Sequence, residues 1–99
     1  MVTREAVLEK LSENAERLKQ NFSVTKLGLF GSFARNEPSP QSDLDILVVF
    51  AEPTFDHYMD LKFYLEKLFQ TSVDLVIADN LKPRLKPQIE KEVVYAKGL

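Results

Sequence analysis

The chain has 99 residues, of which 44% are hydrophobic and seven are Phe, so we expect one modest core and a single domain over residues 1–99. It has no cysteine, which excludes disulfides and thiolate metal sites, and its net charge of −2 argues against a general nucleic-acid coat. No apolar run approaches the roughly 20 residues that span a bilayer, and the N-terminus lacks the apolar segment of a signal peptide. These features predict a cytoplasmic protein that is not membrane-bound.

The charge is unevenly distributed along the chain. Residues 21–80 carry four basic and nine acidic side chains, whereas residues 81–99 carry five basic and two acidic ones. The acidic middle suits a cation site. The basic tail could meet phosphates or an acidic partner, but a solvated charged face explains it equally well.

The first third of the chain predicts a helix, a strand and a loop. Thr3 is a suitable N-cap for a helix with apolar residues at spacings of three and four. They form one face: Val7, Leu8, Leu11, Ala15, Leu18 and Phe22. A strand is expected over 24–30 and one helical turn over 32–36. A loop is expected over 37–42, which holds two prolines and no aliphatic residue.

The remainder alternates strand and helix. The continuous apolar run at 44–50 predicts a strand covered on both faces. A helix is expected over 56–69 and a third strand over 73–77. The helix has an apolar face of Leu61, Tyr64, Leu65 and Leu68. Two prolines within 83–87 bracket a turn or a helix start, and residues 89–95 either continue as helix or end in an edge strand. This order predicts an α/β (α+β) fold, a small mixed sheet with helices packed on it.

Two aspartates stand at the front of the run 44–50, where carboxylates are unfavourable. Asp43 and Asp45 are two residues apart, so in a strand both point to the side opposite Leu44. Carboxylates this close repel, and one is driven towards protonation unless a cation intervenes. Oxygen ligands alone favour Mg²⁺ or Mn²⁺ over Zn²⁺. A turn cap and an ion pair with Arg35 or a lysine would also explain the two acids.

A third aspartate, Asp74, interrupts the apolar run 73–77 in the same way. If the two strands are neighbours, Asp74 joins Asp43 and Asp45 on one surface of the sheet. Three carboxylates so placed would make a two-metal phosphoryl- or nucleotidyl-transfer site.

Gly31 and Ser32 end a predicted strand and open a helical turn. A small residue there lets backbone N–H groups approach an anion, a helix N-terminus favours negative charge, and the Ser32 hydroxyl adds a donor. An ordinary turn before a helix is the alternative. Arg35 could contact phosphates, hold a carboxylate, or be a plain surface arginine.

Together these segments resemble the signature of the nucleotidyltransferase superfamily. The pattern Gly31-Ser32-Phe33-Ala34-Arg35, a gap, Ser42-Asp43-Leu44-Asp45 and an apolar strand looks like the minimal nucleotidyltransferase (MNT) group. The resemblance covers roughly residues 3–95 and implies the polymerase-beta-like fold of that superfamily. One departure is Asn36, where family members often have Gly, and Asn tolerates a left-handed backbone.

The resemblance implies a role for each matching residue. Gly31 and Ser32 match the motif that holds the triphosphate of ATP, and Arg35 and Ser42 fall in the same nucleotide-binding segment. The acids Asp43, Asp45 and Asp74 match the catalytic set that ligates two Mg²⁺ ions. The third acid of the family can also activate the acceptor hydroxyl.

The resemblance also implies a partner and an activity. MNT proteins are typically paired with a HEPN-domain protein as antitoxin and toxin. We therefore expect transfer of AMP from ATP to a tyrosine hydroxyl of a HEPN ribonuclease, within a hetero-oligomer and without direct nucleic-acid contact. Two alternatives stand beside it: an antitoxin that acts by occlusion without catalysis, and a small-molecule nucleotidyltransferase.

Aromatic residues could supply the interface with that partner, although core positions are favoured about two to one. They are Phe55, Tyr58, Phe63, Phe69 and Tyr95. The single histidine, His57, is expected at a helix start or on the surface rather than as a catalytic base.

Overall fold

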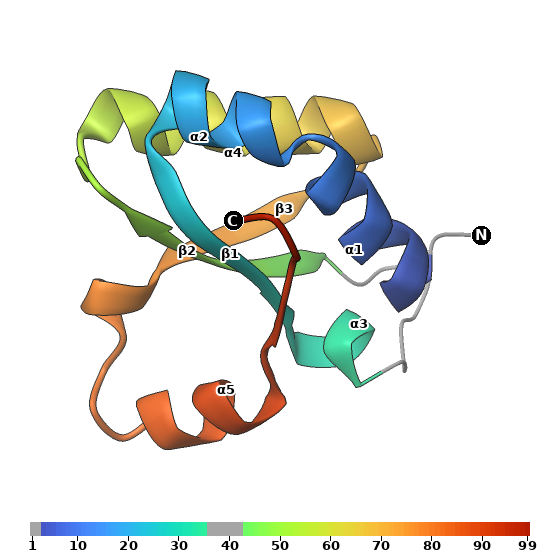
Figure 1. The fold of residues 1–99 in the computed structure, drawn as a ribbon. Coiled ribbons are helices and arrows are strands. Elements are labelled where there is room, and N and C mark those ends of the chain that lie inside the picture. Colours follow the sequence, from blue (N-terminus) through green and yellow to red (C-terminus); the bar gives the residue numbers. More distant parts are fainter. Residues whose placement is uncertain (1–2, 36–42) are drawn as a thin grey trace.

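The computed structural model of the chain describes residues 3–35 and 43–99 (Figure 1). Its elements in chain order are α1 (Arg4–Glu13), α2 (Ala15–Phe22), β1 (Val24–Phe30), α3 (Gly31–Ala34), β2 (Leu44–Phe50), α4 (Phe55–Phe69), β3 (Val73–Ile77), the 3₁₀ turn η1 (Ala78–Asn80), α5 (Lys86–Glu92) and β4 (Val94–Tyr95). The three long strands have the predicted bounds, and α3 and α4 each begin one residue earlier than predicted. The predicted loop over 37–42 lies outside the described residues.

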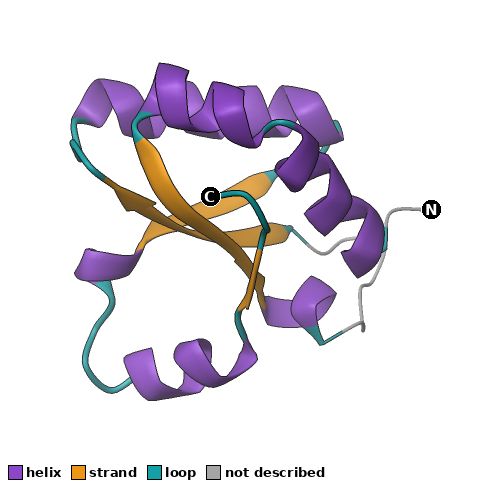
Figure 2. Ribbon diagram, in the orientation of Figure 1, coloured by secondary structure: helices purple, strands orange, loops and turns teal. Residues whose placement is uncertain are grey.

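The four strands form one mixed sheet in the order β3-β2-β1-β4, as the predicted fold class requires. Strand β1 is antiparallel to β2 and β4, whereas β2 is parallel to β3. Helix α4 provides the crossover that a parallel pair needs. As a result, the C-terminal end of β1 and the first residues of β2 and β3 meet at one end of the sheet (Figure 2).

Helices α1, α2 and α4 cover one face of the sheet, and α5 lies on the other side (Figure 1). The core lies beneath the three-helix layer. Its fully buried side chains include Val7, Leu11, Leu18, Leu27, Leu29, Leu44, Ile46, Val48, Leu61 and Leu65. Because side chains alternate along a strand, the burial of Leu44 and Ile46 in this core directs Asp45 to the opposite face.

The N-terminal apolar face belongs to two helices rather than to the single helix that the periodicity predicts. Thr3 caps α1 as expected, since its Oγ1 accepts from the Ala6 N–H at 3.1 Å. Helix α1 ends at Asn14, whose Nδ2 donates to the Lys10 carbonyl at 2.8 Å. Tyr64 of α4 donates its hydroxyl to Oδ1 of the same Asn14 at 2.8 Å. These side-chain hydrogen bonds stabilise Asn14 in the break between α1 and α2, where a continuous helix would otherwise run.

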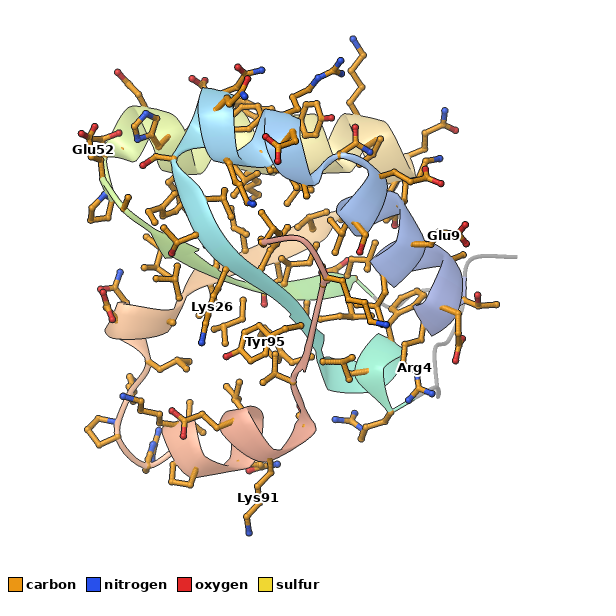
Figure 3. The ribbon with its side chains drawn as sticks, in the orientation of Figure 1. Arg4, Glu9, Lys26, Glu52, Lys91 and Tyr95 are labelled. Carbon is orange, nitrogen blue, oxygen red and sulfur yellow. The ribbon has the colours of Figure 1, made fainter. Side chains whose placement is uncertain are left out.

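The C-terminal segment contains both of the alternatives that the sequence left open, a helix and then an edge strand. Strand β4 pairs with β1 at Gly28 and Leu29. A Cβ atom at Gly28 would lie 2.6 Å from Cγ2 of Val93, so glycine permits this close approach. On the same side, Lys26 Nζ lies 5.2 Å from the ring centre of Tyr95 (Figure 3).

The aromatic residues divide between core and surface. Tyr58 and Phe69 pack against the core, whereas Phe55 and Phe63 are 76% and 59% exposed on α4. His57 lies in the first turn of α4, as predicted, with its N–H bonded to Thr54 Oγ1 at 3.1 Å. Across residues 3–35 and 43–99, the helices are all too short or too polar to cross a membrane.

Candidate active site

The predicted acids meet where β2 and β3 begin. Asp45 lies directly opposite Asp74 in the parallel register of these strands, so the two side chains share one face of the sheet. Asp43 immediately precedes β2. The condition set by the sequence, that the two aspartate-bearing strands be neighbours, is therefore met.

The electrostatics of this group centre on Asp45. Its pKa rises from the ordinary value of 3.8 to about 6, first because burial disfavours the carboxylate and then because Asp74 and Asp43 repel its charge. A hydrogen bond that protonated Asp45 donates to Asp74 raises the pKa further, and the Arg35 cation lowers it by a smaller amount. The sequence-based expectation that one of the acids is driven towards protonation is thus confirmed, and Asp45 is that acid.

Gly31 brings the glycine-serine turn against the same carboxylate. In the β1–β2 register, Asp45 pairs with Phe30, the residue before Gly31. Gly31 has a φ of +75°, and a Cβ atom there would collide with Oδ2 of Asp45. Only glycine accommodates both the left-handed backbone and the adjacent carboxylate. The turn is therefore part of the acidic site.

The other nucleotide-binding candidates lie on either side of this point. Ser32 follows Gly31 in α3 and is half-buried. Arg35 caps the C-terminal end of α3, and its Nη1 donates to Oε2 of Glu92 at 3.1 Å. Arg35 therefore holds a carboxylate, which was one of its predicted roles, although its side chain is 49% exposed. Ser42 lies outside the described residues.

Sequence reasoning missed two residues that support the turn. Glu92 ends α5, and its Oε1 accepts from the Gly31 N–H at 3.0 Å. Arg4 of α1 donates from Nη1 to the Ala34 carbonyl at the end of α3, at 3.1 Å (Figure 3). The only signal for Glu92 is that it is one of two acids in a basic tail, and Arg4 carries no signal at all.

The chemistry of this donor set fits a hard divalent cation. The three aspartates offer carboxylate oxygens as ligands, and repulsion between them is the conflict that such an ion removes. Within the described ranges, however, no group of three Asp, Glu, His or Cys side chains already stands in a metal-holding arrangement.

Comparison with known proteins supports the same assignment. Residues 11–96 match the model of the nucleotidyltransferase domain family. Protein adenylyltransferase MntA of Thermococcus cleftensis is 38% identical over 96 residues, covering 96% of this chain and 97% of the relative. MJ1379 of Methanocaldococcus jannaschii, assigned as a protein adenylyltransferase, is 37% identical over 99 residues, covering 96% and 99% of the two chains.

Solved structures share the fold. One assigned as a minimal nucleotidyltransferase superposes with a TM-score of 0.78 at 35% identity, covering 94% of this chain and 95% of that one. A toxin-antitoxin structure with AMP-PNP superposes with a TM-score of 0.72 at 22% identity, covering 93% and 73%. With its acids and glycine-serine turn at one end of a mixed sheet, the chain belongs to the nucleotidyltransferase domain family, as a minimal member.

Proposed function

We propose that this protein transfers AMP from ATP to a tyrosine hydroxyl of a HEPN-domain toxin and so silences it. The observation that carries the proposal is the placement of Asp45 opposite Asp74 and against Gly31, with Asp43 adjacent. The relatives named protein adenylyltransferases support the reaction. A structure of a tri-AMPylated Shewanella oneidensis HEPN toxin with an MNT antitoxin, which shares the fold at 19% identity, supports the partner class.

The nucleotide would lie along the glycine-serine turn. Ser32 would offer its hydroxyl and N–H to the phosphates, and Arg35 would offer its guanidinium cation. Ser42 completes the family's nucleotide-binding segment. The Gly31 N–H already has an acceptor in Glu92, so Gly31 contributes chiefly through its lack of a side chain.

The three carboxylates would hold the divalent ions, two Mg²⁺ in our proposal. When bound, such ions neutralise the triphosphate and lower the pKa of an acceptor hydroxyl. Asp45 must be deprotonated to take part, and cation binding favours that form.

The reaction is an in-line displacement. The tyrosine oxygen forms a bond to the α-phosphorus, the bond from that phosphorus to the bridging α–β oxygen breaks, and pyrophosphate leaves. The tyrosine proton passes to the Asp74 carboxylate. The absence of cysteine suits a reducing compartment, and we place the reaction in the cytoplasm.

Labelled ATP provides the test. The protein, Mg²⁺ and α-³²P-ATP are incubated with the HEPN protein encoded beside it, and label on each protein is measured after electrophoresis. We expect label on the HEPN protein and a loss of about a hundredfold or more in the Asp43→Asn/Asp45→Asn variant. Asp60→Asn, which changes an exposed acid on α4, is the matched control and should retain full transfer.

Other outcomes would replace the proposal. An unlabelled but silenced toxin in a stable complex would establish occlusion, which the exposed Phe55 and Phe63 of α4 favour as a binding surface. Label in a small product would establish a small-molecule nucleotidyltransferase. Mass spectrometry of the labelled toxin locates the acceptor, and AMP on a residue other than tyrosine would overturn that part alone.

A further inference from the structure

Glu92 connects the C-terminal helix to both ends of α3 through one carboxylate. Its Oε1 accepts from the Gly31 N–H at 3.0 Å, and its Oε2 accepts from Arg35 Nη1 at 3.1 Å. The Glu92 side chain is only 20% exposed, whereas that of Arg35 is 49% exposed. The C-terminal end of α5 comes near α3, and this carboxylate connects the two helices (Figure 1).

The two bonds have different consequences for an incoming phosphate. The first removes the Gly31 N–H from the donors that a phosphate could use. The second holds Nη1 of Arg35 and so fixes the orientation of the whole guanidinium, because that group is a rigid plane. Arg35 also acts on Asp45, whose pKa it lowers, so its charge reaches the acidic group.

We propose that Glu92 is a positioning residue for the nucleotide: it holds Arg35 and the glycine-serine turn in the geometry that receives the triphosphate. The inference rests on the proposed function, because it presumes that a nucleotide binds at this turn. Glu92 acts through Arg35 and does not itself bind the phosphates, because an ionised carboxylate has no hydrogen to donate and repels them. A side chain from α5 thereby sets the affinity of a site built on β1, β2 and β3.

A double-mutant cycle on nucleotide affinity tests the coupling. The dissociation constant of Mg²⁺–AMP-PNP is measured by calorimetry for wild type, Glu92→Gln, Arg35→Gln and the double variant. Gln keeps an oxygen acceptor for the Gly31 N–H but loses the ion pair. We expect Glu92→Gln to weaken binding about tenfold, which is the loss of one charge-assisted contact. In the Arg35→Gln background the same change should have almost no effect.

Glu90→Gln is the matched control. It removes an exposed acid two residues away on the same helix and should leave the affinity for Mg²⁺–AMP-PNP unchanged. Tighter binding by Glu92→Gln would show that the carboxylate competes with the triphosphate, and equal losses in both backgrounds would show a structural role only. Either result overturns the inference. If wild type itself fails to bind Mg²⁺–AMP-PNP, the proposed function fails, and the inference fails with it.

Amide exchange examines the contact without any nucleotide. In the wild-type protein the Gly31 amide should exchange slowly, and Glu92→Ala should accelerate its exchange at least about tenfold, while Glu90→Ala should not. Unchanged Gly31 exchange in folded Glu92→Ala would overturn the inference whatever the binding data show. This readout separates failure of the Glu92 contact from failure of the enzymatic proposal.

Discussion

Asp45 lies opposite Asp74 in two parallel strands that contain no basic residue. The pair therefore lacks a cation on its own strands, and burial together with the two neighbouring acids raises the pKa of Asp45 to about 6. At neutral pH the protein without metal keeps Asp45 ionised at a cost in folding free energy. Such a cost is expected where a site is shaped for a ligand rather than for stability.

Replacing Asp45 by Asn should stabilise the metal-free protein at pH 7.5. The folded pKa of about 6 exceeds the ordinary 3.8, so the folded state binds more protons than the unfolded state between these values. Stability is therefore lost as pH rises through that window, and the full cost persists above it. Because Asp45 is partly exposed, we discount the shift and expect Asp45→Asn to gain about 1 kcal/mol, or a few degrees in Tm.

The pH dependence distinguishes this explanation from a general packing effect. At pH 4.5 the gain of Asp45→Asn should shrink to roughly a third, since Asp45 is then largely protonated in the folded state. Asp60→Asn, exposed on α4, should change Tm little at either pH. A variant that is less stable than wild type in EDTA at pH 7.5 would contradict the prediction.

Divalent ions should stabilise the wild-type protein even without nucleotide. A cation that binds only the folded acids raises Tm in proportion to the logarithm of its concentration once it exceeds the dissociation constant. We expect Mn²⁺ and Mg²⁺ to raise Tm at pH 7.5 and to have a weaker effect at pH 5, where Asp45 is protonated. Thermal unfolding against added MgCl₂, with matched NaCl to hold ionic strength, measures this.

The rise in Tm that divalent ions cause should depend on Asp45 and Asp74, which face each other across β2 and β3. Asp45→Asn/Asp74→Asn should abolish it, and Asp60→Asn/Asp79→Asn, which removes two exposed acids elsewhere, should not. Equal responses in the two double variants would assign the effect to general screening of negative charge. That result would leave the acids without a metal-binding role in the free protein.

Gly31→Ala should damage the site more than an equivalent change at another left-handed glycine. Both Gly31 and Gly98 have positive φ, but a Cβ atom at Gly98 would lie 3.3 Å from Ala15 Cβ, whereas at Gly31 it would collide with Asp45. Backbone strain alone costs about 1–3 kcal/mol at each position. We expect Gly31→Ala to lower Tm further than Gly98→Ala and to lose AMP-PNP binding. Retained nucleotide affinity in folded Gly31→Ala would refute the contact.

Much of this fold follows from local sequence patterns. The apolar runs at 24–30, 44–50 and 73–77 gave strands with the predicted bounds, because each run is flanked by polar or turn-forming residues. The adjacency of Asp45 and Asp74 was left as a condition, which the parallel pairing of β2 and β3 across the α4 crossover meets. The break at Asn14 did not follow, since the apolar spacing continues across it and one of the asparagine's two side-chain hydrogen bonds comes from Tyr64 of α4.

The supporting contacts of the site lie beyond sequence patterns. Glu92 and Gly31 are 61 residues apart in the chain, and Arg4 and Ala34 are 30 apart. Such pairs depend on how α5 and α1 pack around the sheet, and no periodicity or motif encodes that. The meeting of Gly31, Asp45 and Asp74 at one end of the sheet was therefore within reach of the sequence, whereas the contacts that support them were not.

Arg4→Ala should weaken the attachment of α3 to α1, because Arg4 donates to the last carbonyl of α3. The Arg4 guanidinium donates to the Ala34 carbonyl at the end of a four-residue helix, where carbonyls lack the partners that a helix interior provides. Because the Arg4 side chain is 36% exposed, we expect a loss of about 1 kcal/mol, measured by urea unfolding, and weaker AMP-PNP binding. Arg17→Ala, which removes an exposed arginine on α2, should change neither the stability nor the affinity.

A second control tests the ion pair between Arg4 and Glu5. Glu5→Gln removes this exposed partner of Arg4 and should also leave both quantities unchanged, which separates the Ala34 contact from the surface pair. If Glu5→Gln reproduces the full effect of Arg4→Ala, the surface pair rather than the Ala34 carbonyl accounts for the role of Arg4.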